Sequence, residues 1–176
     1  MLRGKQVGLR AIELKDLPLI LEWRNRPELR HYFREFRELS EVNQRAWFDS
    51  ISSKASNFLM FSIVDLSNGE LVGVSGLAYI NWVNRSAEVP VYIGKDDLYI
   101  DDYYALDAVR IVIDYAFKEL GINRLYDKFH AFDAGKRKLC EKLGFTFEGK
   151  LREDHWSSGQ WHDSLIYGLL KKDLSR

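Results

Sequence analysis

The stretch YYALDAVRIVIDYAFKELG, residues 103–121, is the strongest structural signal in the sequence. Its apolar residues recur every three or four positions, as they do on the buried face of an amphipathic helix. Gly121 follows the last of them, and a glycine at that place is typical of a helix C-terminus. We therefore predict a helix over 103–120 and, directly after it, a strand over 123–131.

Helices and strands continue to alternate toward the C-terminus. Asp133 is predicted to begin a further helix that ends near Leu143 and Gly144, and two strands follow near 145–150 and 165–170. A strand, a helix and a second strand in this order favour a parallel pair joined by a right-handed crossover. The second half of the chain is therefore predicted to contain a partly parallel sheet.

The segment before the long helix has the pattern of a hairpin with a third strand beside it. Residues 58–64 and 71–77 are apolar runs on either side of Asn68-Gly69, and Asn-Gly is the strongest short-range hairpin signal. The third run, 87–93, contains Pro90, which has no N–H to donate to a neighbouring strand. We expect the pairing of this third strand to be interrupted at the proline.

The first quarter of the chain is predicted to be one strand followed by helices. Residues 7–12 alternate like a strand, and Asp16 with Pro18 close behind it is typical of a helix start. Ser40 is predicted to begin another helix, which places Trp47 and nearby apolar side chains on one face. The whole chain is thus predicted to have a mixed α+β fold.

Composition and charge indicate a single globular domain over residues 1–176. Hydrophobic residues make up 46% of the chain, and 26 Lys and Arg balance 26 Asp and Glu, so no global field attracts nucleic acid or an anionic membrane. The single cysteine, Cys140, excludes an internal disulfide, and the first residues lack the apolar run of a signal peptide. We therefore expect a cytoplasmic protein with no nucleic-acid or membrane partner.

Several motifs, taken together and in this order, resemble a known family. They are Trp23-Arg24-Asn25, Asn84-Arg85-Ser86-Ala87-Glu88, Tyr115-Ala116-Phe117 with Leu120-Gly121-Ile122-Asn123-Arg124, Glu141-Lys142-Leu143-Gly144-Phe145, and the segments 148–153 and 159–163. The chain is similar to the GNAT N-acetyltransferases, in the branch of the ribosomal-protein and spermidine acetyltransferases. The resemblance covers nearly the whole chain.

The resemblance implies a GNAT-like central mixed sheet of about seven strands with flanking helices, in which two neighbouring strands part. Acetyl-CoA would lie in the gap as co-substrate, and an acceptor amine would attack its thioester directly. Such chemistry needs a base for the amine proton, a donor for the thioester oxygen and an acid for the leaving thiolate. The implied partners are an amine-bearing acceptor and, as is common in the family, a possible second copy of the chain in a homodimer.

The catalytic candidates are Glu88 as base and Cys140 as acid. Relatives often carry a glutamate on this strand beside the acceptor. The alternatives for Glu88 are an ordinary outward polar residue on a half-exposed strand, or a partner for Arg85. Cys140 stands where many relatives have the tyrosine that protonates the thiolate, although a lone cysteine with apolar neighbours is more often an inert core residue. The other candidates for this acid are Tyr103, Tyr104 and Tyr126.

The loop before the long helix departs most from the family pattern. Residues 100–105 lack the glycines and the basic residue with which relatives bind the CoA pyrophosphate at a helix N-terminus. Four Asp and one Lys lie between 95 and 102, a net charge of −3, and Asp102 is predicted to cap the helix by accepting the N–H of Ala105. The residues predicted to contact the cofactor are Val91, Tyr92, Ile93, Tyr103, Tyr104, Ala105, Asp133, Lys136 and Lys138. For the basic residues of this set, the alternative is a solvated helix face.

Acceptor binding is predicted to fall to Trp23, Arg24 and Asn25 in the first helix. His155, Trp156, Trp161 and His162 near the C-terminus are further candidates. No metal site is predicted, because the two histidines have no third ligand. Two functions stay open: an N-acetyltransferase acting on a small molecule, an amino sugar or a protein N-terminus, or a GNAT-fold binding protein that has lost or altered CoA binding.

Overall fold

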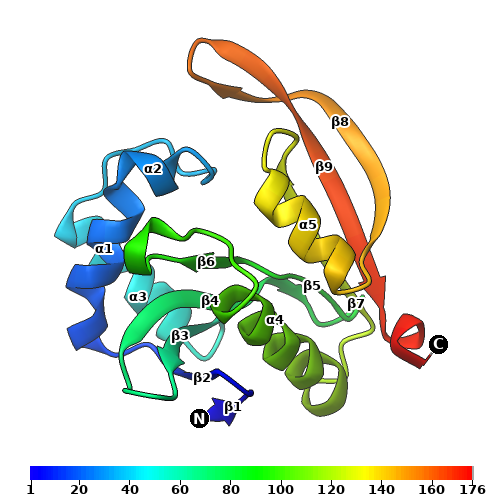
Figure 1. Ribbon diagram of the computed structural model, residues 1–176, viewed down its shortest axis with the longest axis horizontal. Coiled ribbons are helices and arrows are strands. Elements are labelled where there is room, and N and C mark those ends of the chain that lie inside the picture. The colour runs from blue at the N-terminus through cyan, green and yellow to red at the C-terminus, as the bar shows by residue number, and fades with distance from the viewer. Residues whose placement is uncertain (176) are drawn as a thin grey trace.

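The computed structural model describes residues 1–175, which form one sheet with helices packed against it (Figure 1). The strands are β1 (Leu2–Arg3), β2 (Val7–Ala11), β3 (Leu59–Asp65), β4 (Leu71–Asn81), β5 (Ser86–Glu88), β6 (Val91–Ile93), β7 (Arg124–His130), β8 (Thr146–Ser157) and β9 (Gln160–Leu170). The helices are α1 (Leu17–Asn25), α2 (Pro27–Arg30), α3 (Glu41–Ser52), α4 (Tyr104–Asp114) and α5 (Ala134–Lys142), with shorter helical turns at Leu14–Asp16, Lys95–Asp97, Tyr115–Glu119 and Lys171–Ser175.

The sheet is mixed, which confirms the predicted α+β class. Its strands follow the order β1-β2-β3-β4-β5-β7-β9-β8, and β6 pairs with β4 off this path. The pair β5–β7 is parallel and is connected through α4, whereas the other pairs are antiparallel. Nine strands are found among residues 1–175 rather than about seven, because β1 is a two-residue addition and Pro90 divides one strand into β5 and β6.

Local sequence signals account for most element boundaries. Ser40 caps α3 by accepting the N–H of Asn43, whose side chain accepts the N–H of Ser40 in return. Gly69 and Gly121 have positive φ angles of 77° and 67°, at the hairpin turn and after the long helix. That helix begins at Tyr104 and continues beyond Asp114 as a wider π-helical turn over Tyr115–Glu119.

Two apolar clusters hold the helices on the sheet. The larger cluster joins α4 to β2, β4 and β6 and includes fully buried Ala108, Val112 and Leu125. The smaller cluster lies around α1 and includes Ile20 and Trp23. Gly94 is required there, because a Cβ atom on it would lie about 2.0 Å from the Trp23 ring.

The parallel strands β5 and β7 part after three paired residues, and this fork is the feature that positions the candidate site. Ser86 to Glu88 pair with Arg124 to Tyr126, and one more bond joins the N–H of Val89 to the carbonyl of Tyr126 at 3.0 Å. Beyond Pro90, β6 pairs with β4 while β7 pairs with β9. The predicted interruption at Pro90 is confirmed, since a residue without an N–H cannot continue the ladder.

The C-terminal strands are longer than the predicted runs of 145–150 and 165–170. They form a hairpin, β8 and β9, that extends beyond the rest of the sheet (Figure 1) and turns at Ser158 and Gly159. His155, Trp156, Trp161 and His162 therefore lie in paired strands near the hairpin tip rather than in a loop. No helix within residues 1–175 has the length and apolar character needed to cross a bilayer.

Candidate functional site

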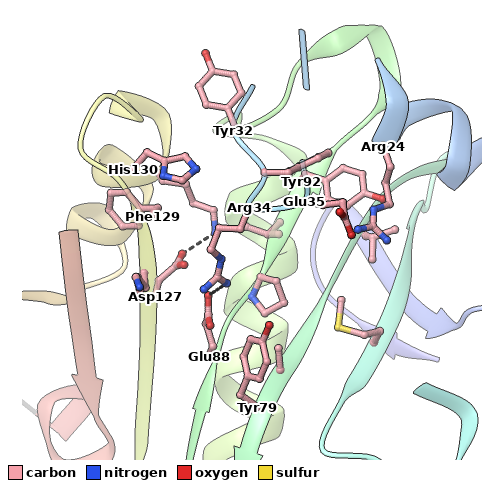
Figure 2. A pocket seen from close by; sticks show the side chains of 18 of the residues that line it. Arg24, Tyr32, Arg34, Glu35, Tyr79, Glu88, Tyr92, Asp127, Phe129 and His130 are labelled. Atoms are coloured by element: carbon pink, nitrogen blue, oxygen red, sulfur yellow. Dashed lines mark hydrogen bonds and ion pairs between the residues drawn. The ribbon is translucent and has the colours of Figure 1, made fainter. Parts of the chain in front are cut away.

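A cavity of about 640 Å³ opens at the fork between β5, β6 and β7. The loop 31–40 between α2 and α3 covers one side of it, and α1 contributes the side chain of Arg24 (Figure 2). The side chain of Lys136 comes from α5. A volume of this size is typical of pockets for small ligands. Of the residues predicted for catalysis, cofactor or acceptor, the structure brings five together in its wall: Arg24, Glu88, Val91, Tyr92 and Lys136.

Glu88 lies at the end of β5 with only 3% of its surface exposed. Its carboxylate forms an ion pair with the guanidinium of Arg34 from the covering loop, rather than with Arg85, the partner considered from the sequence (Figure 2). Burial raises the pKa of the Glu88 carboxyl, and the charge of Arg34 opposes that rise without cancelling it. Glu88 is therefore a buried carboxyl that binds a proton more readily than a free glutamate.

Lys136 enters the same cavity from α5, where its ammonium contacts the carboxylate of Asp127 on β7 at 2.6 Å. Both side chains are 7% exposed, so Lys136 is not on a solvated helix face. Burial alone would lower the pKa of Lys136, but Asp127 raises it, which keeps the ammonium charged. Its charge is therefore already neutralised within the protein.

A hydrogen bond between Asp133 and Tyr99 connects the two sides of the fork. The Asp133 carboxylate caps α5 by accepting the backbone N–H of Lys136 at 2.9 Å, and it also accepts the hydroxyl of Tyr99. Burial raises the pKa of Asp133 and of Tyr99. The sequence predicted the helix start at Asp133, but nothing in the sequence pattern indicated Tyr99 as its partner.

The N-terminus of α4 is occupied by a carboxylate of the same chain. Asp101 accepts the N–H of Tyr104 at 3.0 Å and that of Ala105 at 2.7 Å. The predicted cap at Asp102 is wrong: its carboxylate lies 2.5 Å from the ammonium of Lys142 on α5 instead. Because the N–H groups that a phosphate would use already have an anionic acceptor, this helix terminus does not fit a CoA pyrophosphate.

The loop between β6 and α4 also covers the free edge of β6. Tyr99 exchanges two backbone hydrogen bonds with Ile93, at 2.7 and 3.0 Å, so the edge predicted to contact the cofactor is paired at Ile93. Asp96, Asp97 and Tyr99 have φ angles of 51°, 53° and 50°, a region that residues other than glycine adopt at a cost. The loop thus folds back along the edge of β6 at the fork in a strained conformation.

The remaining cofactor predictions lie outside the cavity wall. Tyr103 is 48% exposed, and the hydroxyl of Tyr104 donates to Asp65 at 2.8 Å. Lys138 is 67% exposed and lies 3.8 Å from Asp102. Cys140 is buried in the larger apolar cluster, where burial raises the pKa of its thiol.

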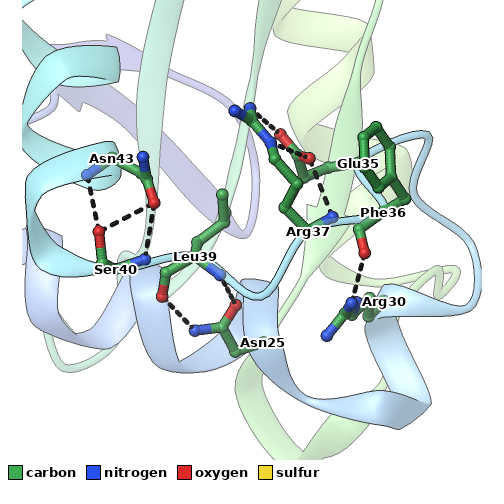
Figure 3. A network of polar contacts seen from close by, with 8 residues as sticks. All are labelled: Asn25, Arg30, Glu35, Phe36, Arg37, Leu39, Ser40 and Asn43. Atoms are coloured by element: carbon green, nitrogen blue, oxygen red, sulfur yellow. Dashed lines mark hydrogen bonds and ion pairs between the residues drawn. The ribbon is translucent and has the colours of Figure 1, made fainter.

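Of the three acceptor-binding predictions in α1, Arg24 alone lines the cavity. Trp23 is buried in the smaller apolar cluster. The Asn25 side chain exchanges two hydrogen bonds with the backbone of Leu39, at 2.8 and 2.9 Å, which anchors the end of the covering loop (Figure 3). These three adjacent residues therefore have three different environments.

His130 is a cavity residue that the sequence did not indicate. It ends β7, is 1% exposed, and stacks on the rings of His155 and Phe132 at 3.9 and 5.1 Å between centroids. Neither ring nitrogen has a hydrogen-bond partner within the described residues. Burial lowers the pKa of His130 to about 4, so the ring is neutral at physiological pH.

Comparisons with known proteins agree with this architecture. A family model described as an acetyltransferase (GNAT) domain matches residues 6–146. An uncharacterized N-acetyltransferase of Bacillus licheniformis, p20, is 27% identical over 173 residues, which cover 97% of this chain and 96% of that protein. The spermidine N(1)-acetyltransferase of Vibrio cholerae is 27% identical over 179 residues, covering 98% of each.

A solved structure shares the fold over nearly the whole chain. The crystal structure of spermidine N-acetyltransferase from Vibrio cholerae, in complex with CoA and spermine, matches with a TM-score of 0.87 at 23% identity. The match covers 97% of this chain and 99% of that one.

Proposed function

The chain belongs to the GNAT family of acetyltransferases and is an acetyl-CoA-dependent N-acetyltransferase, and we propose that it acetylates a primary amine carried by a small molecule that binds in the cavity at the fork. A cavity of about 640 Å³ suits a compact acceptor better than a protein N-terminus, which brings a bulky chain with it. The fork itself supports the proposal, since parting strands are what the family resemblance implies for the transfer site.

The observation that carries the proposal is the buried carboxyl of Glu88 in the cavity wall. An amine that arrives as an ammonium ion must lose a proton before its nitrogen can form a bond to the acetyl carbon. A carboxyl whose pKa is raised by burial is a better acceptor for that proton than an exposed glutamate. We assign Glu88 this role, directly or through one water molecule.

Arg34 is the residue that controls the charge of this base. Its guanidinium is paired with Glu88, and it comes from the loop that covers the cavity. An acceptor ammonium near Glu88 would compete with Arg34 for the same carboxylate. We propose that acceptor binding shifts Arg34 away from Glu88, which returns the carboxylate to the amine.

Transfer by direct attack, without a covalent enzyme intermediate, is also part of the proposal. Cys140 is the chain's single cysteine, and burial raises the pKa of its thiol. A buried protonated thiol is a poor nucleophile, since the thiolate is the reactive form. For the same reason Cys140 is a weaker acid than a free thiol, and its assignment as the proton donor to the leaving thiolate stays a prediction.

The acetyl donor of the family is acetyl-CoA, but no phosphate contact is assigned at α4. Asp101 holds the N–H groups there, and the acidic loop 94–103 surrounds them. Two further predictions also stay open: that residues 1–176 form one domain, which the pairing of β9 with β7 supports, and that the chain forms a homodimer.

The test is an acetyl-transfer assay with a panel of primary amines, which follows thiol release from acetyl-CoA. Glu88→Gln is expected to lower kcat by about 100-fold, the scale of a general base, while its affinity for acetyl-CoA measured by calorimetry stays unchanged. Glu119→Gln, at an exposed position on the far end of the α4 segment, is the matched control. A Glu88→Gln enzyme with the rate of the parent would remove Glu88 from the mechanism.

A further inference from the structure

One arginine of the cavity wall has no partner among residues 1–175. Three arginines line the wall: Arg34 pairs with Glu88, and Arg37 holds Glu35 through two contacts of 2.8 Å. Arg24 lines the wall beside them but makes no hydrogen bond or ion pair within the described residues. A half-buried guanidinium with free N–H groups is an unusual feature inside a cavity, because its five donors normally find acceptors.

Arg24 is nonetheless held in place. Its guanidinium lies over the ring of Trp47 at 5.8 Å from the ring centroid, on the α3 side of the cavity. A guanidinium that stacks on an aromatic face is oriented by that contact, while the N–H groups on its edge stay available. The side chain is therefore preorganised to bind an oxyanion through two parallel hydrogen bonds.

Tyr92 supplies a second unpartnered donor at the same end of the cavity (Figure 2). Its hydroxyl is buried and has no hydrogen-bond partner within the described residues. A buried hydroxyl without a partner costs stability, so one is retained where a ligand completes it. Arg24 and Tyr92 come from different elements, α1 and β6, and both side chains lie on the same side of the cavity.

The charges nearby leave this end positive. Glu35 is hydrogen-bonded to Arg37, which lowers the pKa of the Glu35 carboxyl to about 2 and keeps it ionised; the charge of Arg24 adds a smaller lowering without a hydrogen bond. Arg24, Arg37 and Glu35 together therefore carry one net positive charge. At the opposite side, Glu88 forms an ion pair with Arg34 (Figure 2). Asp127 forms an ion pair with Lys136 from α5.

We propose that the acceptor carries an anionic group, a carboxylate or a phosphate, which Arg24 and Tyr92 bind while its amine lies near Glu88. This inference rests on the proposed function and narrows the substrate class to amines that also carry a negative charge. A polyamine has no group for Arg24 and would meet a like charge there. On this basis the acceptor differs in class from those named for the spermidine acetyltransferases that the chain resembles.

The test compares matched amines with and without the anion. The carboxylate arm is 4-aminobutyrate against butylamine, the phosphate arm is 3-aminopropyl phosphate against 3-aminopropanol, and spermidine is added as the polycation. In the parent enzyme, kcat/KM for one anionic member is expected to exceed that of its neutral partner by about tenfold or more, which one charge-assisted hydrogen bond can supply. Whichever arm gives the larger ratio identifies the anion as carboxylate or phosphate.

Three variants test whether the preference for anionic amines depends on Arg24 and Tyr92. Arg24→Gln is expected to abolish the ratio, and Tyr92→Phe to reduce it by a few fold while keeping the aromatic packing. Arg45→Gln is the matched control, because Arg45 also lies over a ring, that of Phe48, but on the exposed face of α3. Melting temperatures of all variants show whether they are folded. If Arg24→Gln does not fold, Tyr92→Phe still tests the inference.

Binding is measured separately from turnover, by calorimetry on the same ligands with the parent and with Glu88→Gln. If anionic amines bind in an Arg24-dependent manner but no acetyl group is transferred, the proposed function fails and this inference stands. A preference for spermidine, equal rates for both members of each pair, or no binding of any panel member at millimolar concentration would overturn it. The inference would also be overturned if Arg24→Gln left the ratio of kcat/KM between anionic and neutral amines unchanged.

Discussion

Two groups of polar residues around the fork differ in one respect: one group is fully paired and the other is not. Toward α4 and α5, Asp101, Asp133 and Lys136 each have a partner from the chain itself. At the acceptor end, the donors of Arg24 and Tyr92 have no partner in the part of the chain that the structure describes. A positive potential or a helix terminus is therefore a ligand site only where the protein's own groups leave the donors free.

The comparison changes the interpretation of the motif positions. The N-terminus of α4 is where the family resemblance predicts an anion, yet Asp101 fills it. Arg24 was one of three candidates in α1, and its guanidinium makes no hydrogen bond or ion pair with any described residue. Pairing in the folded chain, not residue type, separates the two cases.

The largest effect is expected when an ion pair toward α5 is broken. Lys136→Met leaves the Asp127 carboxylate buried without its partner, which is expected to lower the free energy of unfolding by about 3–5 kcal/mol. Urea denaturation followed by circular dichroism measures this. The double variant Lys136→Met/Asp127→Leu is expected to recover most of the loss, whereas a single variant within about 1 kcal/mol of the parent would contradict the pairing.

The acidic loop can be opened by removing the carboxylate that fills the helix terminus. Asp101→Gly with Tyr103→Gly is expected to tighten acetyl-CoA binding by about tenfold, because the N–H groups of Tyr104 and Ala105 become free for a phosphate. Calorimetric titration measures the affinity, with Asp114→Asn on the exposed face of α4 as control. Unchanged or weaker binding would count against the idea that the loop opposes the cofactor.

The bridge from Tyr99 to Asp133 is expected to contribute less. Tyr99→Phe removes the hydroxyl from a buried carboxyl that keeps its backbone partner, so the free energy of unfolding is expected to fall by about 1–2 kcal/mol. The same variant also removes the contact that holds loop 94–103 to Asp133. Faster hydrogen exchange of the loop amides would detect this. Protection of those amides equal to that of the parent would mean that the bridge does not hold the loop.

His130 gives the smallest effect, which depends on pH. Because its pKa falls from about 6.5 unfolded to about 4 folded, the unfolded chain binds more protons between these values. Stability is therefore lost as the pH falls through this window, by about 1 kcal/mol between about pH 7 and about pH 5.5. Thermal melts of His130→Gln, compared with the parent across that range, are expected to show a flatter profile; parallel profiles would exclude a neutral buried ring.

Much of the fold was predictable because its signals are local. The break at Pro90 follows from a missing N–H, and the cap at Ser40 from a side chain three residues from its partner. The long hairpin of β8 and β9 was underestimated, because its outer residues are polar and exposed and lack the alternation that marks a half-buried strand.

The candidate site was predictable only in part. Glu88 was indicated by the family motif, but its partner Arg34 lies 54 residues earlier in a loop without a motif. His130 ends a strand whose pattern says only that the residue is part of the sheet. Residues of this kind become candidates only when the fold shows which polar groups share a buried space.

The sequence by itself determined the order of the elements, the place where the central strand breaks, and the family to which the chain belongs. These features depend on spacing along the chain and on backbone chemistry. The tertiary structure alone decided that Asp101 rather than Asp102 caps α4, that Lys136 is neutralised by Asp127, and that Arg24 lies in the cavity wall over the Trp47 ring. The physical reason is that a charge acts on whatever lies within a few ångströms of it, and that distance is set by folding rather than by sequence separation.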